Sequence, residues 1–365
     1  MRKLRVAVVG AGRLGGFHAR KLALWPNVEL AGIVDPVADS RERLAAECGA
    51  PAFADHRPLL GQIDAAIVAA PTHLHHAIAA DLLNWGVHVL VEKPLCATSA
   101  EADDLVRLAK RHGAILQVGH VERFNPAFAS ALPVAANPKY IEAVRAGGFT
   151  FRSTDIGVVL DLMIHDLDLA LCLVRSPVRR VEALGLSVLG GHEDVANARI
   201  EFECGCVASF SASRVSSEPA RRMQVWSAGG YAAIDFAART TTLVRPSEAI
   251  LQRQLDAAAL AAAPDRDQIL KAHLPHETTR HEASDALALE LADFLESILG
   301  RRSPQAPGEA GRDAVALAER ILRKIHTHAW DARPDGPIGP MAVPRPAAVP
   351  SPHFRLSPHS ASIPG

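Results

Sequence analysis

A glycine-rich turn near the start of the chain constrains its fold more than any other feature. Gly10-Ala-Gly-Arg-Leu-Gly15 directly follows an apolar, β-branched run, Leu4–Val9, and precedes a helical pattern. In such a turn the first glycine permits a tight bend, the second lets a pyrophosphate approach the backbone, and the third lets helix and strand pack closely. The turn therefore predicts a βαβ unit that binds a dinucleotide. The residues expected around its phosphates are Gly10, Gly12, Arg13, Leu14 and Gly15.

The residue that ends the second apolar run indicates which dinucleotide is bound. Asp35 lies 20 residues after Gly15, where a carboxylate accepts hydrogen bonds from both hydroxyls of the adenosine ribose and repels a 2′-phosphate. We therefore expect NAD rather than NADP. Ser40 and Arg41 are the residues through which a phosphate could still be bound.

The first third of the chain alternates short apolar runs with helical patterns. After Leu4–Val9 the runs are Val28–Val34, Ala65–Ala69, Val87–Val91 and Ile115–Val118. Continuous apolar runs are typical of strands buried on both faces, and single helices between them imply right-handed crossovers. Thr98 and Glu101 form a capping box that opens one such helix. We predict an NAD-binding Rossmann domain over residues 1–120, an α/β fold with a doubly wound parallel sheet.

The pattern changes after about residue 120. One strongly apolar helix, about Val159–Val174, is followed by alternating strands, with a hairpin at Cys204-Gly-Cys206. Two amphipathic helices follow, about Ser284–Leu299 and Ala310–Thr327, whereas the Ala-rich stretch Arg239–Ala283 shows no clear pattern. This predicts an α+β domain over residues 121–337, with an open, mainly antiparallel sheet that binds substrate and mediates oligomerisation.

Composition restricts the rest of the chain and its partners. Many of the 25 prolines crowd Ile338–Gly365, which cannot bury enough apolar surface to order itself, so residues 338–365 are expected to be a disordered tail. A net charge of -1 argues against nucleic acid or a membrane surface as a partner. Five scattered cysteines and no leader-like segment predict a cytoplasmic protein with reduced thiols.

The turn after the fifth run carries a lysine at a position suited to chemistry. Glu92-Lys93-Pro94 ends a buried strand, and open parallel sheets bind ligands beyond the carboxyl ends of their strands. Lys93 is therefore expected in the crevice, where a lysine beside a nicotinamide can help remove a hydroxyl proton. We expect Glu92 and Lys93 to contact the cofactor, and the proline allows a cis peptide bond. The alternative is a surface Glu/Lys pair at a strand end.

A histidine-rich turn follows the fourth run. Pro71-Thr72-His-Leu-His75-His76 has three histidines in four residues, but no cysteine or acid lies nearby at ligand spacing. We therefore expect no metal site. Pro71, Thr72 and His75 are instead predicted to face the cofactor.

The apolar helix carries a polar stripe. At about 100° per residue, Asp161, His165 and Asp168 fall within about 60° of one another, and burying them unpaired would cost several kcal/mol. The i, i+4 spacing lets Asp161 orient His165, which would make a general base near neutral pH. The alternative is a buried network of only structural value. Asp166 lies off the stripe and is given no role.

Together these motifs resemble the Gfo/Idh/MocA oxidoreductase family, from about Leu4 to Thr327. The resemblance implies a dehydrogenase in which Lys93, Asp161 and His165 surround the reacting carbinol. One difference is Met163, where many members have glycine; it is expected to reshape the pocket.

Two further segments are similar to those of the UDP-N-acetylglucosamine 3-dehydrogenase subgroup: residues 118–126 and 151–166. That subgroup works with an aminotransferase to make a 2,3-diamino sugar for lipid A. The similarity implies NAD-dependent oxidation of the 3-hydroxyl of a nucleotide sugar. Arg123 and Arg152 would then contact the diphosphate, and Asn125 an amide or hydroxyl. Alternatively, either arginine anchors the seam between the domains.

Three other functions stay open. They are oxidation of another substrate such as myo-inositol or a free aldose, an NAD-dependent glycosidase, and a non-catalytic NAD-binding sensor. A sensor need not keep a base at the nicotinamide, so the set of Lys93, Asp161 and His165 favours an enzyme. The open, apolar sheet face is expected to pair with another subunit in a homodimer or homotetramer.

Overall fold

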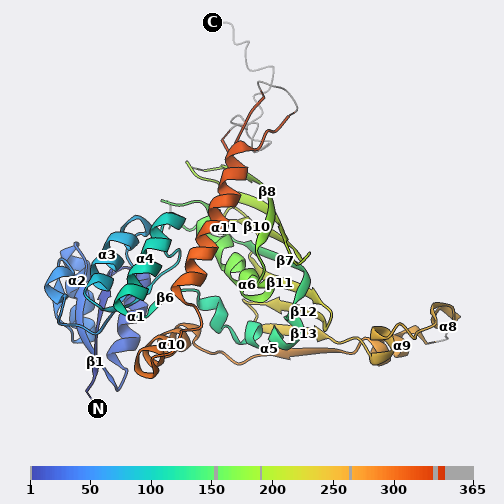
Figure 1. The fold of residues 1–365 in the computed structure, drawn as a ribbon, viewed down its shortest axis with the longest axis horizontal. Coiled ribbons are helices and arrows are strands. Elements are labelled where there is room, and N and C mark those ends of the chain that lie inside the picture. Colours follow the sequence, from blue (N-terminus) through green and yellow to red (C-terminus); the bar gives the residue numbers. More distant parts are fainter. Residues whose placement is uncertain (1, 152–154, 190, 263–264, 332–335, 342–365) are drawn as a thin grey trace, which may run out of the picture.

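The computed structural model describes residues 2–151, 155–189, 191–262, 265–331 and 336–341. Within these residues the chain forms two sheets, each with its own helices (Figure 1). Arg152, one of the expected substrate contacts, lies outside the described residues, as do residues 342–365 of the predicted tail.

The first sheet is parallel, and its strand order is β3-β2-β1-β4-β5-β6. This order is the doubly wound arrangement, so the predicted fold class is confirmed. The strands are β1 (Leu4–Val9), β2 (Val28–Val34), β3 (Ala52–Phe53), β4 (Ala65–Val68), β5 (His88–Val91) and β6 (Leu116–Val118). The helices between them are α1 (Arg13–Ala23), α2 (Ala38–Cys48), α3 (Thr72–Asn84) and α4 (Ser99–His112).

Both faces of this sheet are covered, which explains its continuous apolar strands. Successive side chains of a strand point to opposite faces. Val6 and Val8 therefore share one apolar layer with α1 and α2, while Ala7 and Val9 share the other with α3 and α4. The carboxyl ends of the strands are left free for the crevice.

The second sheet is mixed, with the order β14-β13-β12-β11-β7-β10-β9-β8. Only β7 and β10 pair in parallel among the described strands of this sheet. The strands are β7 (Pro138–Ala146), β8 (Val178–Leu186), β9 (Val195–Phe202), β10 (Val207–Ser213), β11 (Ala220–Ser227), β12 (Gly230–Asp235), β13 (Thr240–Val244) and β14 (His276–Arg280). The predicted hairpin at Cys204-Gly-Cys206 joins β9 and β10.

The helix expected at about Val159–Val174 is not one regular helix. It begins with a π-helical turn, Val159–Met163, and continues as α6 (Ile164–Val174). A π-helical turn is wider than an α-helical turn, so residues before it lose their α-helical register with residues after it. Asp161 lies within this turn, whereas His165 and Asp168 both follow it in α6. A 3₁₀ turn, Val121–Phe124, and α5 (Pro126–Ala135) lie earlier in the same domain.

The last two helices connect the domains. Leu291, Phe294 and Leu295 of α10 (Ala286–Gly300) belong to the same buried layer as Val6 and Val8 of the first sheet. Figure 1 shows α11 (Gly308–Thr327) running between α4 and the second sheet. After crossing the second domain the chain therefore returns to the first, so α10, from the predicted second domain, packs on the sheet of residues 1–120.

The stretch without a clear sequence pattern contributes β13 and β14 to the edge of the second sheet and forms a projecting arm between them. The arm contains α7 (Glu248–Leu251), α8 (Ala257–Ala262) and α9 (Arg266–His273). Figure 1 shows α8 and α9 at the end of a long extension, away from both sheets. Every residue of β14 is exposed.

The start of the predicted tail is packed against the second domain. Gly339 N donates to His328 O at 2.9 Å, and Ser187 N donates to Pro340 O at 3.0 Å. The folded chain therefore extends at least to Met341, rather than ending before Ile338. Among the described residues, no helix is both long enough and apolar enough to cross a bilayer.

Candidate active site

A cleft of about 1150 Å³ opens between the two domains. The glycine turn lines one part of it, and Lys93, Asp161 and His165 line another. Ligand pockets commonly measure roughly 300–1000 Å³, so the cleft has room for a dinucleotide and a second molecule. The residues predicted for cofactor binding and those predicted for chemistry therefore open onto one cavity.

The glycine turn is shaped for close approach of a phosphate. Gly10 has a φ of 105°, and a Cβ there would lie 2.4 Å from Ala69 O. A Cβ on Gly15 would lie 1.8 Å from Gly10 O, whereas one on Gly12 would meet nothing within 4 Å. The first turn of α1 has no acidic residue and no capping side chain. Its free N–H groups are therefore available to an anion.

Asp35 is held with its carboxylate at the cleft. Its Oδ2 accepts a hydrogen bond from Ala11 N at 2.7 Å, and its Oδ1 accepts one from Val37 N at 2.9 Å. Each oxygen keeps a second lone pair for a ribose hydroxyl. Arg41 is turned to the backbone, where its guanidinium donates to Pro36 O at 3.1 Å. These positions fit NAD.

The Pro71-Thr72-x-x-His75 motif is divided between the cleft and the core. Pro71 precedes α3 and lines the cleft. Thr72 and His75 are buried and are not among the cleft-lining residues. The ring nitrogens of His75 lie 2.8 Å from Pro94 O and from Ala70 O. The cofactor contact expected of Thr72 and His75 is therefore corrected: His75 braces the turn that carries Lys93.

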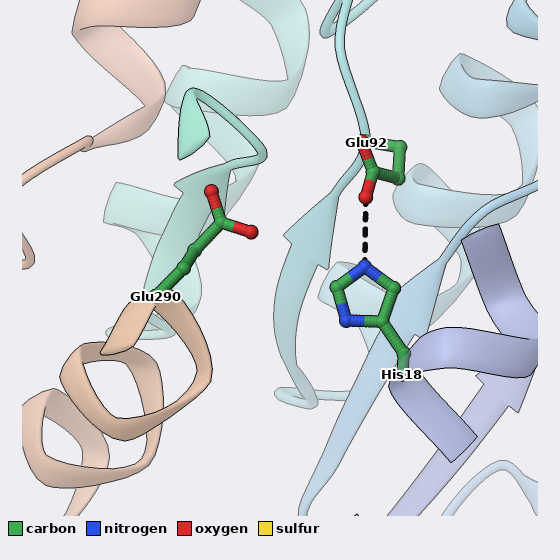
Figure 2. Close-up of side chains that lie close together, drawn as sticks. All are labelled: His18, Glu92 and Glu290. Carbon is green, nitrogen blue, oxygen red and sulfur yellow. Dashed lines mark hydrogen bonds and ion pairs between the residues drawn. The ribbon is translucent and has the colours of Figure 1, made fainter. Parts of the chain in front are cut away.

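The Lys93–Pro94 peptide bond is cis, as the sequence allowed. Glu92, expected at the cofactor, is instead buried behind the turn. Its Oε1 lies 2.7 Å from His18 Nε2, and its Oε2 accepts from Lys93 N at 3.3 Å (Figure 2). Burial alone would raise the pKa of Glu92, but the hydrogen bond from His18 and the charge of Lys93 lower it below its usual value. Glu92 is thus an ionised anchor for the turn.

A second buried carboxyl group faces this pair. Figure 2 shows Glu290 of α10 directed toward Glu92 and His18. Neither carboxyl oxygen of Glu290 has a hydrogen-bond partner among the described residues. Burial and the neighbouring charge of Glu92 raise the pKa of Glu290 well above its usual value, which favours the uncharged form of its carboxyl group. Because His18 and Glu92 bond each other directly, we assign the cluster to support of the turn.

Lys93 is oriented by Asp161. Its Nζ donates to Asp161 Oδ1 at 2.9 Å and to Asp161 O at 2.7 Å. Lys93 belongs to the first domain and Asp161 to the second, so the two hydrogen bonds cross the cleft. Both side chains are mostly buried but reach the cavity. The expectation that Asp161 orients His165 is therefore wrong. The π-helical turn between them removes the i, i+4 geometry on which that expectation depended.

His165 lines the cleft without a partner of its own. Its Nδ1 is buried and makes no hydrogen bond within the described part of the chain. Burial lowers the pKa of His165 well below 6.5, and the positive charges of Lys93 and Arg145 lower it further. The imidazole is therefore neutral at pH 7 and able to accept a proton.

Arg123 anchors the seam between the domains. Its Nε and Nη2 each donate to the buried carboxylate of Asp168 at 2.7 Å, and its Nη1 donates to Gln305 O at 2.5 Å. Asn125 is buried as the N-cap of α5 and accepts from Ala127 N at 3.1 Å. Neither residue lines the cleft. The substrate contacts expected of Arg123 and Asn125 are therefore corrected, whereas Asp168 is paired, as a buried carboxylate requires.

Two arginines that the sequence did not single out, Arg145 and Arg221, also line the cleft. Arg145 is buried on β7, where it contacts Asp166 at 3.0 and 2.8 Å and Glu122 at 2.7 Å. Asp166 thus has a structural partner. The signal in the sequence was an arginine at an inward position of an alternating strand.

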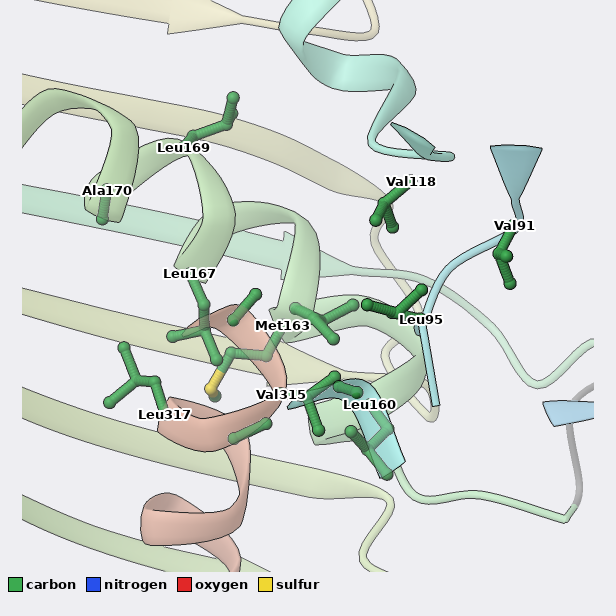
Figure 3. Close-up of a cluster of buried hydrophobic side chains, with 14 of the residues drawn as sticks. Val91, Leu95, Val118, Leu160, Met163, Leu167, Leu169, Ala170, Val315 and Leu317 are labelled. Atoms are coloured by element: carbon green, nitrogen blue, oxygen red, sulfur yellow. The ribbon is translucent and has the colours of Figure 1, made fainter. Parts of the chain in front are cut away.

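Met163 does not shape the cleft as expected. It is buried and does not line the cavity. Figure 3 shows it in the apolar cluster that includes Leu167, Val315 and Leu317. Its side chain fills the core between α6 and α11.

Comparison with known proteins identifies matches across most of the chain. A model described as "Oxidoreductase family, NAD-binding Rossmann fold" matches residues 4–120, and one described as "GFO/IDH/MocA C-terminal domain" matches residues 118–233. The chain is 36% identical over 320 residues to UDP-N-acetylglucosamine 3-dehydrogenase of Acidithiobacillus ferrooxidans, covering 87% of this chain and 96% of that one. It is 31% identical over 233 residues to scyllo-inositol 2-dehydrogenase (NAD(+)) of Bacillus subtilis, covering 59% and 68%.

Solved structures match over a similar span. A crystal form of the Acidithiobacillus ferrooxidans UDP-N-acetylglucosamine 3-dehydrogenase has a TM-score of 0.77 and 34% identity, covering 89% of this chain and 98% of that one. A levoglucosan dehydrogenase in complex with NADH has a TM-score of 0.75 and 17% identity, covering 88% and 97%. The second likeness shows the shared fold alone.

Proposed function

Since the chain belongs to the Gfo/Idh/MocA family of NAD-binding oxidoreductases, we propose that it oxidises the 3-hydroxyl of UDP-N-acetylglucosamine to the 3-keto sugar. The observation that carries this proposal is the pairing of Lys93 with Asp161 beside an uncharged His165, in the cleft that holds the glycine turn. The 36% identity over 320 residues to a UDP-N-acetylglucosamine 3-dehydrogenase supports the choice of substrate.

The residues of the cleft can divide the work of alcohol oxidation. NAD, when bound, supplies the hydride acceptor. The ammonium of Lys93, aimed by Asp161, donates a hydrogen bond to the substrate oxygen, and neutral His165 accepts the hydroxyl proton. The walls of the cleft limit the access of water during the hydride step.

The product suggests the next reaction. A 3-keto sugar is the substrate of an aminotransferase, and their combined product would be a 2,3-diamino sugar for lipid A, as in the similar subgroup. That role places the enzyme in the cytoplasm, where nucleotide sugars are available.

A substrate panel tests the proposal. UDP-N-acetylglucosamine, N-acetylglucosamine, myo-inositol and glucose are each offered with NAD and with NADP, and NADH or NADPH formation is followed by absorbance. We expect the highest kcat/KM with UDP-N-acetylglucosamine and NAD. A higher value with myo-inositol would transfer the assignment to the second candidate, which the inositol dehydrogenase relative favours. Release of a free sugar without NADH accumulation would indicate a glycosidase.

We further propose that the chain forms a homo-oligomer through the outer face of the second sheet. The rings of Tyr140, Trp226 and Tyr231 cluster on that face, with centroids 5.1 and 5.0 Å apart. The sequence predicted an apolar face, but Arg222 and Asp235 form an ion pair on it. The short helices of the arm also do not pack against either sheet (Figure 1), and isolated helices of this length are marginal in water.

Light scattering of wild type and Trp226→Glu tests the proposed oligomer. We expect the wild type to be oligomeric and Trp226→Glu to be a smaller species; a monomeric wild type would contradict the proposal.

A further inference from the structure

Arg221 lies where the second sheet meets the cleft. In β11 it occupies the same face as Met223 and Val225, which point into the domain, while Arg222 points to the opposite face. On the neighbouring strand β7, Arg145 is its register partner. Both arginines line the cleft beside His165. Two guanidinium groups thus approach one wall of the cavity.

The two arginines differ in their partners. Arg145 is held by Asp166 and Glu122, with contacts of 2.7 to 3.0 Å. Arg221 has no ion pair or side-chain hydrogen bond with any residue that the structure describes. Its charge does reach the site, because it contributes to the lowered pKa of His165, after burial and the charges of Lys93, Arg145 and His120. Glu122 and Asp166 supply counter-charge without contacting it.

An unpartnered guanidinium in a cleft points to an anionic ligand. Guanidinium groups bind phosphate oxygens through two parallel hydrogen bonds, and these charge-assisted bonds are among the stronger ones in proteins. In a nucleotide sugar whose 3-hydroxyl lies at Lys93 and His165, the anomeric carbon is separated from the reacting carbon by a single ring atom. The diphosphate therefore begins close to the reacting atoms, within reach of a guanidinium that lines the same cavity as His165.

We propose that Arg221 binds the diphosphate of the nucleotide-sugar substrate, an inference that rests on the proposed function. Arg221 takes the role that the sequence suggested for Arg123. The guanidinium of Arg123 already donates to Asp168 and to Gln305 O. Arg221 would thereby distinguish a nucleotide sugar from a neutral polyol or aldose. Neutral substrates would gain nothing from this residue.

The test measures binding of UDP to the NADH-saturated enzyme by calorimetry, so that the cofactor site is already filled. The variants are Arg221→Met, Arg221→Lys and the control Arg222→Met, whose residue pairs with Asp235 on the opposite face. We expect Arg221→Met to weaken UDP binding roughly 10- to 100-fold, the range of a lost charged hydrogen bond. The affinity of Arg221→Lys for UDP should lie between those of wild type and Arg221→Met, because lysine keeps the charge but cannot form the two parallel hydrogen bonds. Arg222→Met should bind UDP like the wild type.

Two results overturn this inference: wild-type enzyme that does not bind UDP, or Arg221→Met that binds it unchanged. Unchanged NADH affinity and melting temperature show that each variant is folded. KM for UDP-N-acetylglucosamine should rise in Arg221→Met with a smaller change in kcat. If wild type binds UDP through Arg221 but oxidises no UDP-N-acetylglucosamine, the proposed reaction fails and the anion site stands. If wild type oxidises this substrate and Arg221→Met has the same KM, only the present inference fails.

Discussion

At the scale of single residues, the site depends on which charged group each side chain contacts. Asp161 directs the ammonium of Lys93 into the cleft. Nδ1 of His165 has no hydrogen-bond partner among the residues that the structure describes, and burial lowers the pKa of His165. One side chain is therefore poised to hydrogen-bond the substrate oxygen and another to take its proton.

Loss of either group should be severe. We expect Lys93→Ala and His165→Ala each to reduce kcat by more than about 100-fold, the usual size of an acid–base contribution. Steady-state kinetics on the best substrate measures this, and NADH titration checks that the cofactor site is intact. Near-normal turnover in both variants would contradict the assigned roles.

Two substitutions in the glycine turn can distinguish an effect on cofactor binding from an effect on folding. A Cβ on Gly12 meets nothing within 4 Å, whereas one on Gly15 lies 1.8 Å from Gly10 O. We expect Gly12→Ala to keep its melting temperature but to bind NADH at least about 10-fold more weakly, because the methyl group occupies the phosphate's position. Gly15→Ala should lower the melting temperature as well. Equal NADH affinity in wild type and Gly12→Ala would show that the phosphates lie elsewhere.

At the scale of elements, the π-helical turn and α10 shape the site. Asp161 lies in the π-helical turn, where its side chain and its backbone carbonyl both accept from Lys93. From α10, Glu290 is placed behind the Glu92–Lys93 turn, although the two residues are far apart in sequence (Figure 2).

The buried carboxyl of Glu290 should make stability depend on pH. Its pKa is raised above the usual 4.5 when folded, so the folded protein binds more protons than the unfolded chain above about pH 4.5, and stability falls as pH rises from there toward the folded pKa. We expect Glu290→Gln to lose this dependence and to be more stable than wild type at alkaline pH. Denaturant unfolding across pH measures it. Glu296→Gln, at an exposed position of α10, serves as the control, and parallel curves for wild type and Glu290→Gln would refute the prediction.

At the scale of the whole molecule, the two domains are joined by more than their linker. Helix α10 completes a face of the first sheet, and Arg123 connects the 3₁₀ turn to α6 and to Gln305. These contacts between the domains therefore fix the position of the glycine turn relative to the Lys93–Asp161 pair. The C-terminal residues Ile338–Met341 add a contact to β8 and to the end of α11.

Two truncations should locate the end of the part of the chain that stabilises the fold. We expect removal of residues 342–365 to leave the melting temperature and kcat unchanged. Removal from Ile338 onward should lower the melting temperature, because the bonds of Gly339 and Pro340 to His328 and Ser187 are lost. Thermal unfolding compares the two, and an equal effect of both truncations would contradict this boundary.

The sequence by itself determined the doubly wound domain, the NAD turn and the place of Lys93. Each of these depends on local periodicity and on backbone freedom within one strand–turn–helix unit. Only the tertiary structure decided how the charges pair: Asp161 with Lys93, Asp168 with Arg123, and Arg221 with no described partner. Ion pairs between distant elements depend on where those elements meet, and local periodicity does not contain that information.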